Sequence, residues 1–255
     1  MATLVCGFFV ALTWLGAIFI RPILRVLIRS QGDINGVLGN LVSIYGIFYG
    51  ILMGLLAVAA YQNKVDVEQA ITTEGIALFA YFRNVSAYPE EARRPLQESA
   101  RDYTRFMIDN EWPQMQQGEL AKGGLPLINR MQEQLTKFQP KGAEQFILHQ
   151  ESTQQFYKFL EMRALRLLSA KSGIPGIMWY VVMLGALISI FLIWLFNMSL
   201  VAHLILGGLM SFFVGSMITL IIVLDRPLRG EYGIDPENFR ILLNFMNTMM
   251  GVPAG

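Results

Sequence analysis

LGNLVSIYGIFYGILMGLLAVAA, residues 38–60, is the stretch of sequence that decides the fold class. It contains no Asp, Glu, Lys or Arg over 23 residues. A helix of roughly 20 apolar residues is long enough to cross the hydrocarbon core of a bilayer. The stretch Leu38–Ala60 therefore predicts a transmembrane helix.

Three other stretches have the same character. They are Thr3–Ile20, Ile177–Phe196 and Leu200–Leu224. The first has no basic residues before it and an apolar run longer than that of a usual signal peptide, so we interpret it as a spanning helix. The last two are separated by only three residues, 197–199, which predicts a tight helical hairpin. The sequence thus predicts four transmembrane helices.

Charged residues concentrate between the second and third of these helices. Of 20 Lys and Arg and 19 Asp and Glu, 14 of each lie in residues 61–175. In this region, stretches whose apolar residues recur at helical spacing are separated by Pro and Gly. We therefore expect an all-α integral membrane protein with a cytoplasmic helical domain between the second and third transmembrane helices. The expected parts are a first transmembrane pair (1–60), the cytoplasmic domain (61–175), a second transmembrane pair (176–225) and a C-terminal cytoplasmic helix (226–255).

The orientation follows from Lys and Arg near the helix ends. Four crossings place both termini and the central domain on one side. On that side lie Lys64, Arg163, Arg166, Lys171, Arg226, Arg229 and Arg240, and on the other only Arg21, Arg25 and Arg29. An excess of positive charge marks the cytoplasmic side. The sequence therefore predicts a cytoplasmic domain and cytoplasmic termini.

Several classes of function find no support in the sequence. The net charge of +1 gives no basic face for nucleic acid, and the single Cys6 gives neither a disulfide framework nor a cysteine zinc site. The four apolar segments lack the carboxylates that ion-coupled pumps use. No glycine-rich phosphate loop, no nucleophile elbow and no pair of histidines at metal-ligand spacing occurs. We expect no catalytic residue, metal site or cofactor, and we interpret the chain as not an enzyme.

One face of the second segment is small and mildly polar. At 100° per residue it carries Gly36, Asn40, Ser43, Ile47, Gly50, Gly54 and Val58. One interpretation is close helix packing, within or between subunits. The other is a pore wall, where Asn40 and Ser43 hydrogen-bond a partly dehydrated ion and Ile47 and Val58 form apolar constrictions. A pore requires a ring of subunits, because one four-helix subunit is too thin to enclose it.

Three arginines follow the first segment at four-residue spacing. Arg21, Arg25 and Arg29 would lie on one face of a short helix that accepts Pro22 in its first turn. They either meet lipid headgroups at the membrane interface or form a positive vestibule that concentrates anions at a pore mouth.

Several residues of the hydrophilic regions are expected to be structural links. A helix over 66–84 continues the second segment, and Glu74 falls within its apolar stripe. A carboxylate there needs a partner, and we expect an arginine from a neighbouring helix. A second helix starts near Pro89 and should end at Glu111-Trp112-Pro113.

The chain after the fourth segment predicts one more helix. Asp225 and Arg226 stand where the fourth helix leaves the lipid, and Pro227 stops that helix. A helix then follows Asp235-Pro236-Glu237. It is apolar nearly all round, so it should pack on the cytoplasmic domain or on a neighbouring subunit.

Four stretches together resemble a known family. They are Tyr45-Gly-Ile-Phe-Tyr-Gly50, Glu68-Gln-Ala70 leading to Glu74, Asn110-Glu-Trp-Pro113 and Leu224-Asp-Arg-Pro-Leu-Arg-Gly230. With the two-plus-two arrangement of membrane helices, they resemble bacterial and plant-type bestrophin-like membrane proteins that share a domain of unknown function. The resemblance implies a bacterial inner-membrane protein that forms a ring of four-helix subunits. It also implies second helices that line an anion-conducting pore.

Two hypotheses of function follow. The first is a homo-oligomeric, chloride-type anion channel whose partners are membrane lipid, further copies of itself and inorganic anions. The second is a non-conducting membrane-anchored scaffold or sensor that binds a protein through its cytoplasmic helices. The number of subunits and the residues around their axis distinguish the two.

Overall fold

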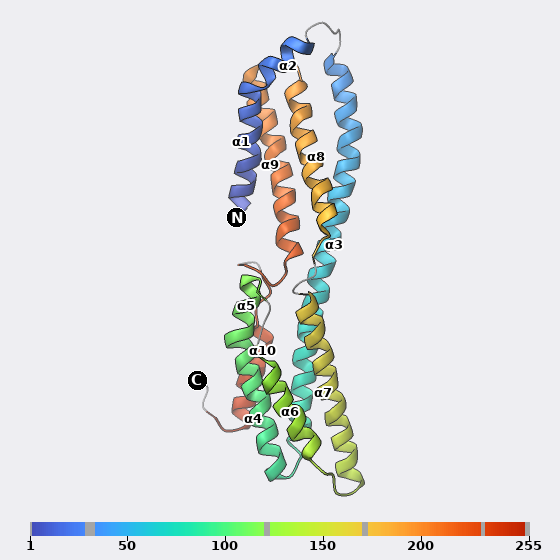
Figure 1. Ribbon diagram of the computed structural model, residues 1–255, viewed down its shortest axis with the longest axis vertical. Helices are drawn as coiled ribbons and strands as arrows, with labels where there is room; N and C mark the ends of the chain where they lie inside the picture. Colours follow the sequence, from blue (N-terminus) through green and yellow to red (C-terminus); the bar gives the residue numbers. More distant parts are fainter. Residues whose placement is uncertain (1, 29–33, 120–122, 170–172, 231–232, 253–255) are drawn as a thin grey trace. The chain divides into compact units, whose positions relative to one another are not determined.

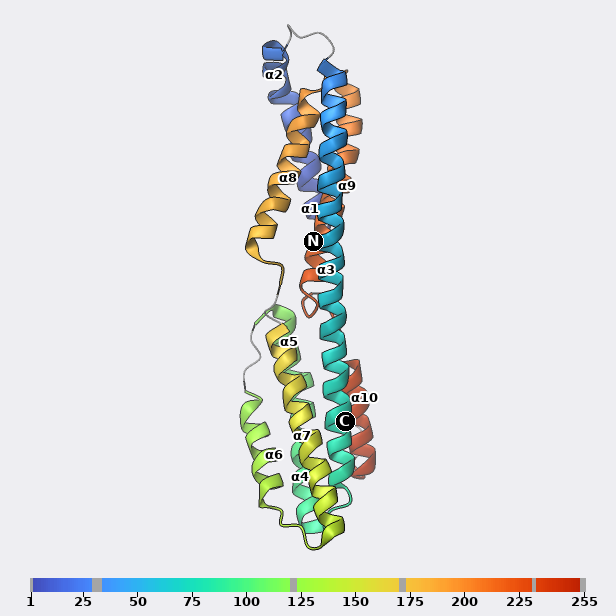
Figure 2. The same cartoon turned by 90° about the vertical axis from the view of Figure 1, so that its right-hand side faces the viewer.

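A computed structural model describes residues 2–28, 34–119, 123–169, 173–230 and 233–252. Every secondary-structure element in these ranges is helical, as Figures 1 and 2 show. The chain divides into two compact units. Unit 1 comprises Met1–Gln62 and Gly173–Asp225, and unit 2 comprises Asn63–Ser172 and Arg226–Gly255.

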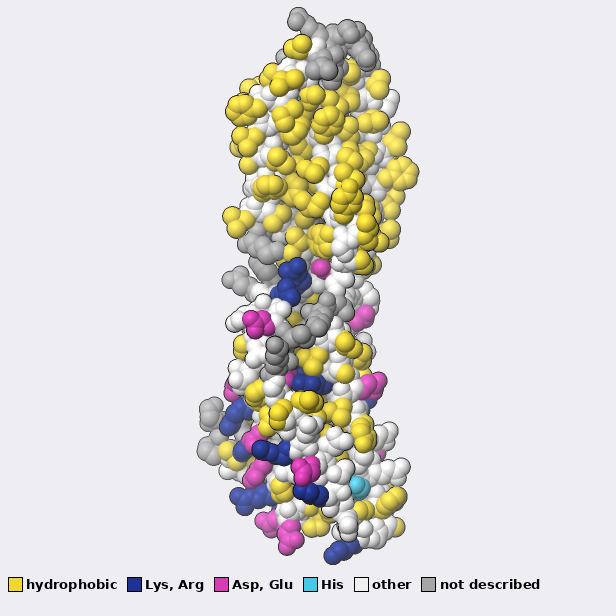
Figure 3. Space-filling view, in the orientation of Figure 1, with side chains coloured by type: hydrophobic (Ala, Val, Ile, Leu, Met, Phe, Trp, Pro, Cys, Tyr) yellow, Lys and Arg dark blue, Asp and Glu magenta, His cyan; other side chains and the backbone are white. Residues whose placement is uncertain are grey.

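Unit 1 contains the apolar helices. They are α1 (Ala2–Phe19), α2 (Arg21–Ile28), the first part of α3 (Ile34–Val85), α8 (Gly176–Leu195) and α9 (Leu200–Asp225). All four predicted apolar segments are thus helical. By length and composition α3, α8 and α9 can cross a membrane, whereas the apolar stretch of α1 is shorter. Figure 3 shows almost only hydrophobic side chains over this unit, while charged side chains are spread over unit 2.

Small residues let α1 and α9 approach closely. The Thr13 hydroxyl of α1 contacts the Ser211 hydroxyl of α9 at 2.5 Å between oxygens. A Cβ atom built on Gly215 would lie 3.0 Å from the Cα of Cys6. In lipid the hydrophobic effect does not drive helices together, so their association depends on van der Waals contact. Small residues allow helices to approach closely enough for that contact. The α1–α9 pair therefore depends on the glycines of α9.

Replacing Gly215 by leucine should separate α1 from α9. The new side chain meets backbone, which cannot move aside as a flexible side chain can, so we expect a cost of about 1–3 kcal/mol. Thermal denaturation of the purified protein in detergent measures the effect. Gly7→Leu is the matched control, because a Cβ on Gly7 has no atom within 4 Å. Equal melting temperatures for the two variants would contradict the prediction.

The turn between α8 and α9 is held by two residues from the start of the chain. A guanidinium nitrogen of Arg21 donates to the carbonyl of Met198. The Asn35 amide nitrogen donates to the carbonyl of Asn197 at 3.0 Å, and its amide oxygen accepts the Asn197 N–H at 2.8 Å. The predicted tight hairpin is thus fastened to α2 and to the first turn of α3.

Unit 2 is a helical bundle with its own core. It contains the remainder of α3, α4 (Glu90–Phe106), η1 (Met107–Glu111), α5 (Trp112–Gln117), α6 (Leu125–Lys137), α7 (Ala143–Ser169) and α10 (Glu237–Met249). The predicted helix over 66–84 is confirmed as a continuation of the second apolar segment within α3. Phe239, Leu242 and Met246 of α10 are buried in the same core as Ile71 and Leu78 of α3. The C-terminal helix therefore packs on this unit.

The expected helix end at Glu111-Trp112-Pro113 is wrong. Residues Met107–Glu111 form a π-helical turn, in which the Trp112 N–H donates to the Met107 carbonyl, and α5 continues directly from Trp112. A proline ring inside an α-helix collides with the carbonyl four residues earlier. The wider π turn directly before Pro113 changes the hydrogen-bond register by one residue, so the chain remains helical through the proline.

Candidate pore-lining face and buried charge cluster

Two tyrosines attach α3 to α8. The Tyr49 hydroxyl donates to the Val182 carbonyl at 3.0 Å, and the Tyr45 hydroxyl donates to the Gly185 carbonyl. The two rings stack with their centroids 5.6 Å apart. A Cβ on Gly185 would collide with the Tyr49 ring, so the glycine is needed for this approach. These contacts fix which side of α3 faces the rest of unit 1.

The small-residue face of α3 is turned away from unit 1. Ile47 is 63% exposed and Val58 is 66% exposed. Asn40, Ser43 and Gly50 are also exposed, and Gly54 is half-buried. A Cβ on Gly50 or Gly54 would meet no atom within 4 Å. The face therefore does not pack within the subunit, and its surroundings are lipid, another subunit, or water and ions.

The arginine triplet is only partly described. The predicted short helix is confirmed as α2, with Pro22 in its first turn. Arg21 is buried and binds the Met198 carbonyl. The side chain of Arg25 and the whole of Arg29 lie outside the described parts of the structure.

Asp225 joins the end of α9 to the chain before α8. Its carboxylate is buried, and Oδ1 accepts the backbone N–H of Ile174 at 2.6 Å. A Cβ on Gly173 would lie 3.2 Å from Oδ2. Arg226 is exposed, and its carbonyl accepts the Arg229 N–H in the turn that follows.

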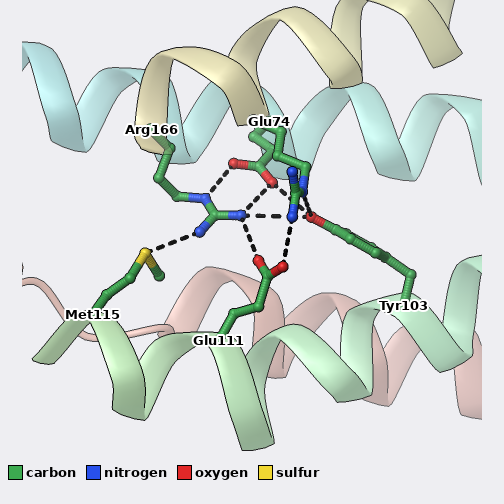
Figure 4. Close-up of polar contacts among 6 residues, drawn as sticks. Glu74, Tyr103, Glu111, Met115 and Arg166 are labelled. Atoms are coloured by element: carbon green, nitrogen blue, oxygen red, sulfur yellow. Dashed lines mark hydrogen bonds and ion pairs between the residues drawn. The ribbon is translucent and has the colours of Figure 1, made fainter. Parts of the chain in front are cut away.

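A charge cluster lies buried at the centre of unit 2 (Figure 4). Arg166 of α7 binds Glu74 of α3 through two bonds, Nε to Oε2 at 2.6 Å and Nη2 to Oε1 at 3.0 Å. The same Nη2 lies 3.3 Å from Oε2 of Glu111, and Arg163 Nη2 lies 2.5 Å from Oε1 of Glu111. The negative charges of two carboxylates are thus neutralised by the positive charges of two guanidiniums. The arginine partner expected for Glu74 is Arg166.

Neighbouring side chains complete the cluster. The Tyr103 hydroxyl donates to Glu74 Oε1 at 3.2 Å and accepts from Arg163 Nε at 3.0 Å. Arg166 Nη1 contacts the Met115 sulfur at 3.2 Å, and its guanidinium lies over the Trp112 ring at 6.0 Å. Every polar atom that faces the cluster's centre therefore has a partner.

Electrostatics keep both arginines of the cluster charged. Burial is the largest single influence on Arg166 and would lower its pKa, but the electrostatic effects of Glu74, Tyr103 and Glu111 and the hydrogen bond to Glu74 together outweigh burial and raise this pKa above its usual range. Burial, followed by the charge of Glu74, raises the pKa of the Tyr103 phenol, which stays neutral. The cluster links α3, α4, η1 and α7 through buried ion pairs and hydrogen bonds. Its arrangement fits a structural role.

Two of the stretches singled out in the sequence meet in unit 2. The Trp112 indole N–H donates to the Ile234 carbonyl at 3.1 Å. Arg229 donates to the Gly118 carbonyl at 3.0 Å, and the Gly230 N–H donates to the Gln116 carbonyl at 3.4 Å. Gly118 ends α5 with φ +82°, a conformation that other residues rarely adopt. The Glu-Trp-Pro segment thus anchors the chain that leads to α10.

Replacing Gly124 by alanine should destabilise the charge cluster. A Cβ at this position would collide with the Glu111 carboxylate and lie 2.8 Å from Arg163 Nη2. The ion pair would have to move, so we expect a loss of about 1–3 kcal/mol in stability. Thermal denaturation measures it, with Gly75→Ala of the same unit as control, because a Cβ there meets no atom within 4 Å. A Gly124→Ala variant as stable as this control would contradict the prediction.

Sequence reasoning identified Glu74, Glu111 and Trp112 but not the roles of Arg163, Arg166 and Tyr103. One signal was available, because Arg166 interrupts an apolar stripe of α7 at helical spacing from Phe159 and Met162. An arginine in such a stripe requires a buried anion, as Glu74 requires a cation. In the described part of the chain, no group of three or more His, Cys, Asp or Glu side chains is placed to hold a metal ion.

Comparisons with known proteins identify a family and solved structures that are similar to this chain. A family model described as a Bestrophin-like domain matches residues 7–239. A crystal structure of a variant bacterial bestrophin homologue from Klebsiella pneumoniae has a TM-score of 0.71 at 14% identity, covering 96% of this chain and 99% of that chain. Another structure of a bestrophin homologue from the same organism has a TM-score of 0.69 at 14% identity, covering 97% and 99%. No curated protein matches the sequence.

Proposed function

The chain belongs to the bestrophin-like family, and from this premise we propose that it is a membrane channel. In this proposal identical subunits form a ring in a bacterial inner membrane, and the small-residue faces of their α3 helices line a path for inorganic anions of the chloride type. Both termini and unit 2 lie in the cytoplasm, in keeping with the excess of Lys and Arg there.

The outward face of α3 is the observation that carries the proposal. Tyr45 and Tyr49 occupy the other side of the helix, so Asn40, Ser43 and Ile47 are left for a partner outside the subunit. The face contains no carboxylate that would repel an anion. An anion that has lost part of its hydration shell needs hydrogen-bond donors, and the Asn40 amide supplies N–H groups.

The remaining residues of the face determine how the width of the path varies along its length. Ile47 and Val58 narrow it with apolar side chains, whereas Gly50 and Gly54 widen it between them. Arg21, Arg25 and Arg29 form a positive vestibule that raises the local anion concentration at the mouth. Arg21 is buried against the Met198 carbonyl, so in this proposal its charge acts through the field rather than by direct contact.

Reconstitution tests the proposal directly. The full chain is purified, its subunit number is measured by native mass spectrometry, and chloride efflux from liposomes is followed with an ion-selective electrode. We expect a closed homo-oligomer and a chloride flux far above that of empty liposomes. A well-folded oligomer that passes no chloride, or a ring axis filled by lipid, would overturn the proposal.

One observation favours the second candidate function, a non-conducting scaffold or sensor. Ile241, Phe245 and Met249 of α10 are 59%, 42% and 48% exposed. Ile241 and Phe245 border, with Ile76 and Phe79 of α3, an apolar groove of about 280 Å³ in unit 2. Exposed apolar patches of this kind mark interaction sites. A stoichiometric protein captured from native membranes, and lost on Phe245→Ser, would favour the scaffold, whereas a second copy seated there would favour the ring.

A further inference from the structure

Unit 1 contains a cavity at the flank of the proposed pore wall, next to Gly50. It measures about 220 Å³ and lies between α3, α8 and α9. From α3 it is bordered by Gly46, Gly50 and Met53, and from α9 by Met210 and Met217. A Cβ on Gly46 would meet no atom within 4 Å, so this stretch of α3 has no packing partner there.

The hydroxyl groups around the cavity already have partners. Tyr45 and Tyr49 donate to carbonyls of α8. Ser189 donates to the Gly185 carbonyl at 3.0 Å, and Ser211 contacts the Thr13 hydroxyl. A polar ligand or a chain of waters would gain few hydrogen bonds here, and a polar molecule in apolar surroundings needs them. The occupant must therefore be apolar.

The size of the cavity restricts the occupant further. An apolar cavity of about 150 Å³ accepts a molecule as large as benzene. A narrow hydrocarbon chain is the apolar occupant that both fits the space and is abundant in a membrane.

We infer that the cavity binds one acyl chain of a membrane lipid. The acyl chain fills the space that Gly46 leaves and supports α3 at its flank. Contacts of this kind supply dispersion energy, which drives packing in lipid. Methionines suit such a site, because their flexible side chains adapt to an irregular occupant. The site does not depend on whether the protein conducts ions.

Photochemical labelling tests the site without any measurement of flux. The full chain is reconstituted with phosphatidylcholine that carries a diazirine in the middle of an acyl chain, illuminated and mapped by mass spectrometry. We expect labels concentrated on residues 42–53 of α3 and 210–217 of α9. Gly46→Leu fills the cavity and should reduce this labelling at least fivefold. Met217→Phe fills it from α9 and serves if Gly46→Leu does not fold.

Gly39→Leu is the matched control, because Gly39 lies two turns earlier on the same side of α3 and outside the cavity lining. It should leave the labelling unchanged. Equal labelling in Gly46→Leu and Gly39→Leu would overturn the inference. So would labels spread evenly over all apolar helices, or labelling that disappears when the subunits assemble, since a neighbouring copy would then cover the cavity.

Discussion

Replacing Arg166 by methionine should destabilise unit 2 by about 3–5 kcal/mol, the typical cost of breaking a buried ion pair. Methionine keeps most of the volume but removes the charge that Glu74 and Glu111 share. Both carboxylates would then be buried with only Tyr103 and Arg163 as partners. Since each kcal/mol lowers the melting temperature by about 2–4 °C at this size, we expect a fall of roughly 6–20 °C.

Thermal denaturation of the full chain in detergent measures this fall. Arg94→Met is the matched control, because Arg94 forms a surface pair with Glu98 and its side chain is 75% exposed. Exposed pairs contribute little to stability. Adding Glu74→Gln to Arg166→Met should cost less than the sum of the two single changes, because the residues interact. If the Arg166→Met and Arg94→Met variants have the same melting temperature, the cluster does not stabilise the fold.

Replacing Ile47 by glutamate should reduce chloride flux more than tenfold, if the proposed channel is correct. Every subunit would then add a carboxylate to the narrow part of the path. At about 5 Å and an effective dielectric constant of 20, one such charge repels an anion by about 3 kcal/mol. A barrier increase of about 1.4 kcal/mol already slows a process tenfold. Efflux from liposomes containing the variant measures the reduction.

The control for this prediction separates charge from polarity. Ile47→Gln introduces a side chain of the same length as glutamate without the charge, so it should retain chloride flux. Size-exclusion chromatography checks that both variants keep the wild-type oligomeric state. A glutamate variant that conducts chloride like the wild type would show that Ile47 does not face the ion path.

Local patterns predicted the helices of this fold well. The apolar run 38–60 and the stripe through Ile71 and Leu78 share one helical period, so their continuity in α3 was readable from the sequence. The four-residue spacing of the arginines after the first segment predicted the short helix that contains Arg21 and Pro22. Each of these features depends on residues close together in the chain, where helix geometry alone decides the outcome.

Pairings between distant residues were not readable. Glu74 and Arg166 are 92 positions apart, and many other arginines in unit 2 had the right charge. The π turn before Pro113 depends on the packing of Glu111 and Trp112 into the core, which overrides the local tendency of a helix to stop before proline. The outward direction of Ile47 follows from bonds that Tyr45 and Tyr49 make to carbonyls of α8, and backbone carbonyls carry no signal in the sequence.

The interrupted course of unit 2 along the chain has a consequence for biosynthesis. Residues 63–172 leave the ribosome before α8 and α9, but the core of the unit also needs Leu228, Phe239 and Met246, which are translated only after α9. Until then Trp112 lacks the Ile234 carbonyl that its indole binds. Part of the core of the nascent bundle therefore remains exposed while α8 and α9 are translated. Maturation of this unit is tied to the translation of α10, and a chain that ends before α10 leaves an apolar surface for chaperones and proteases.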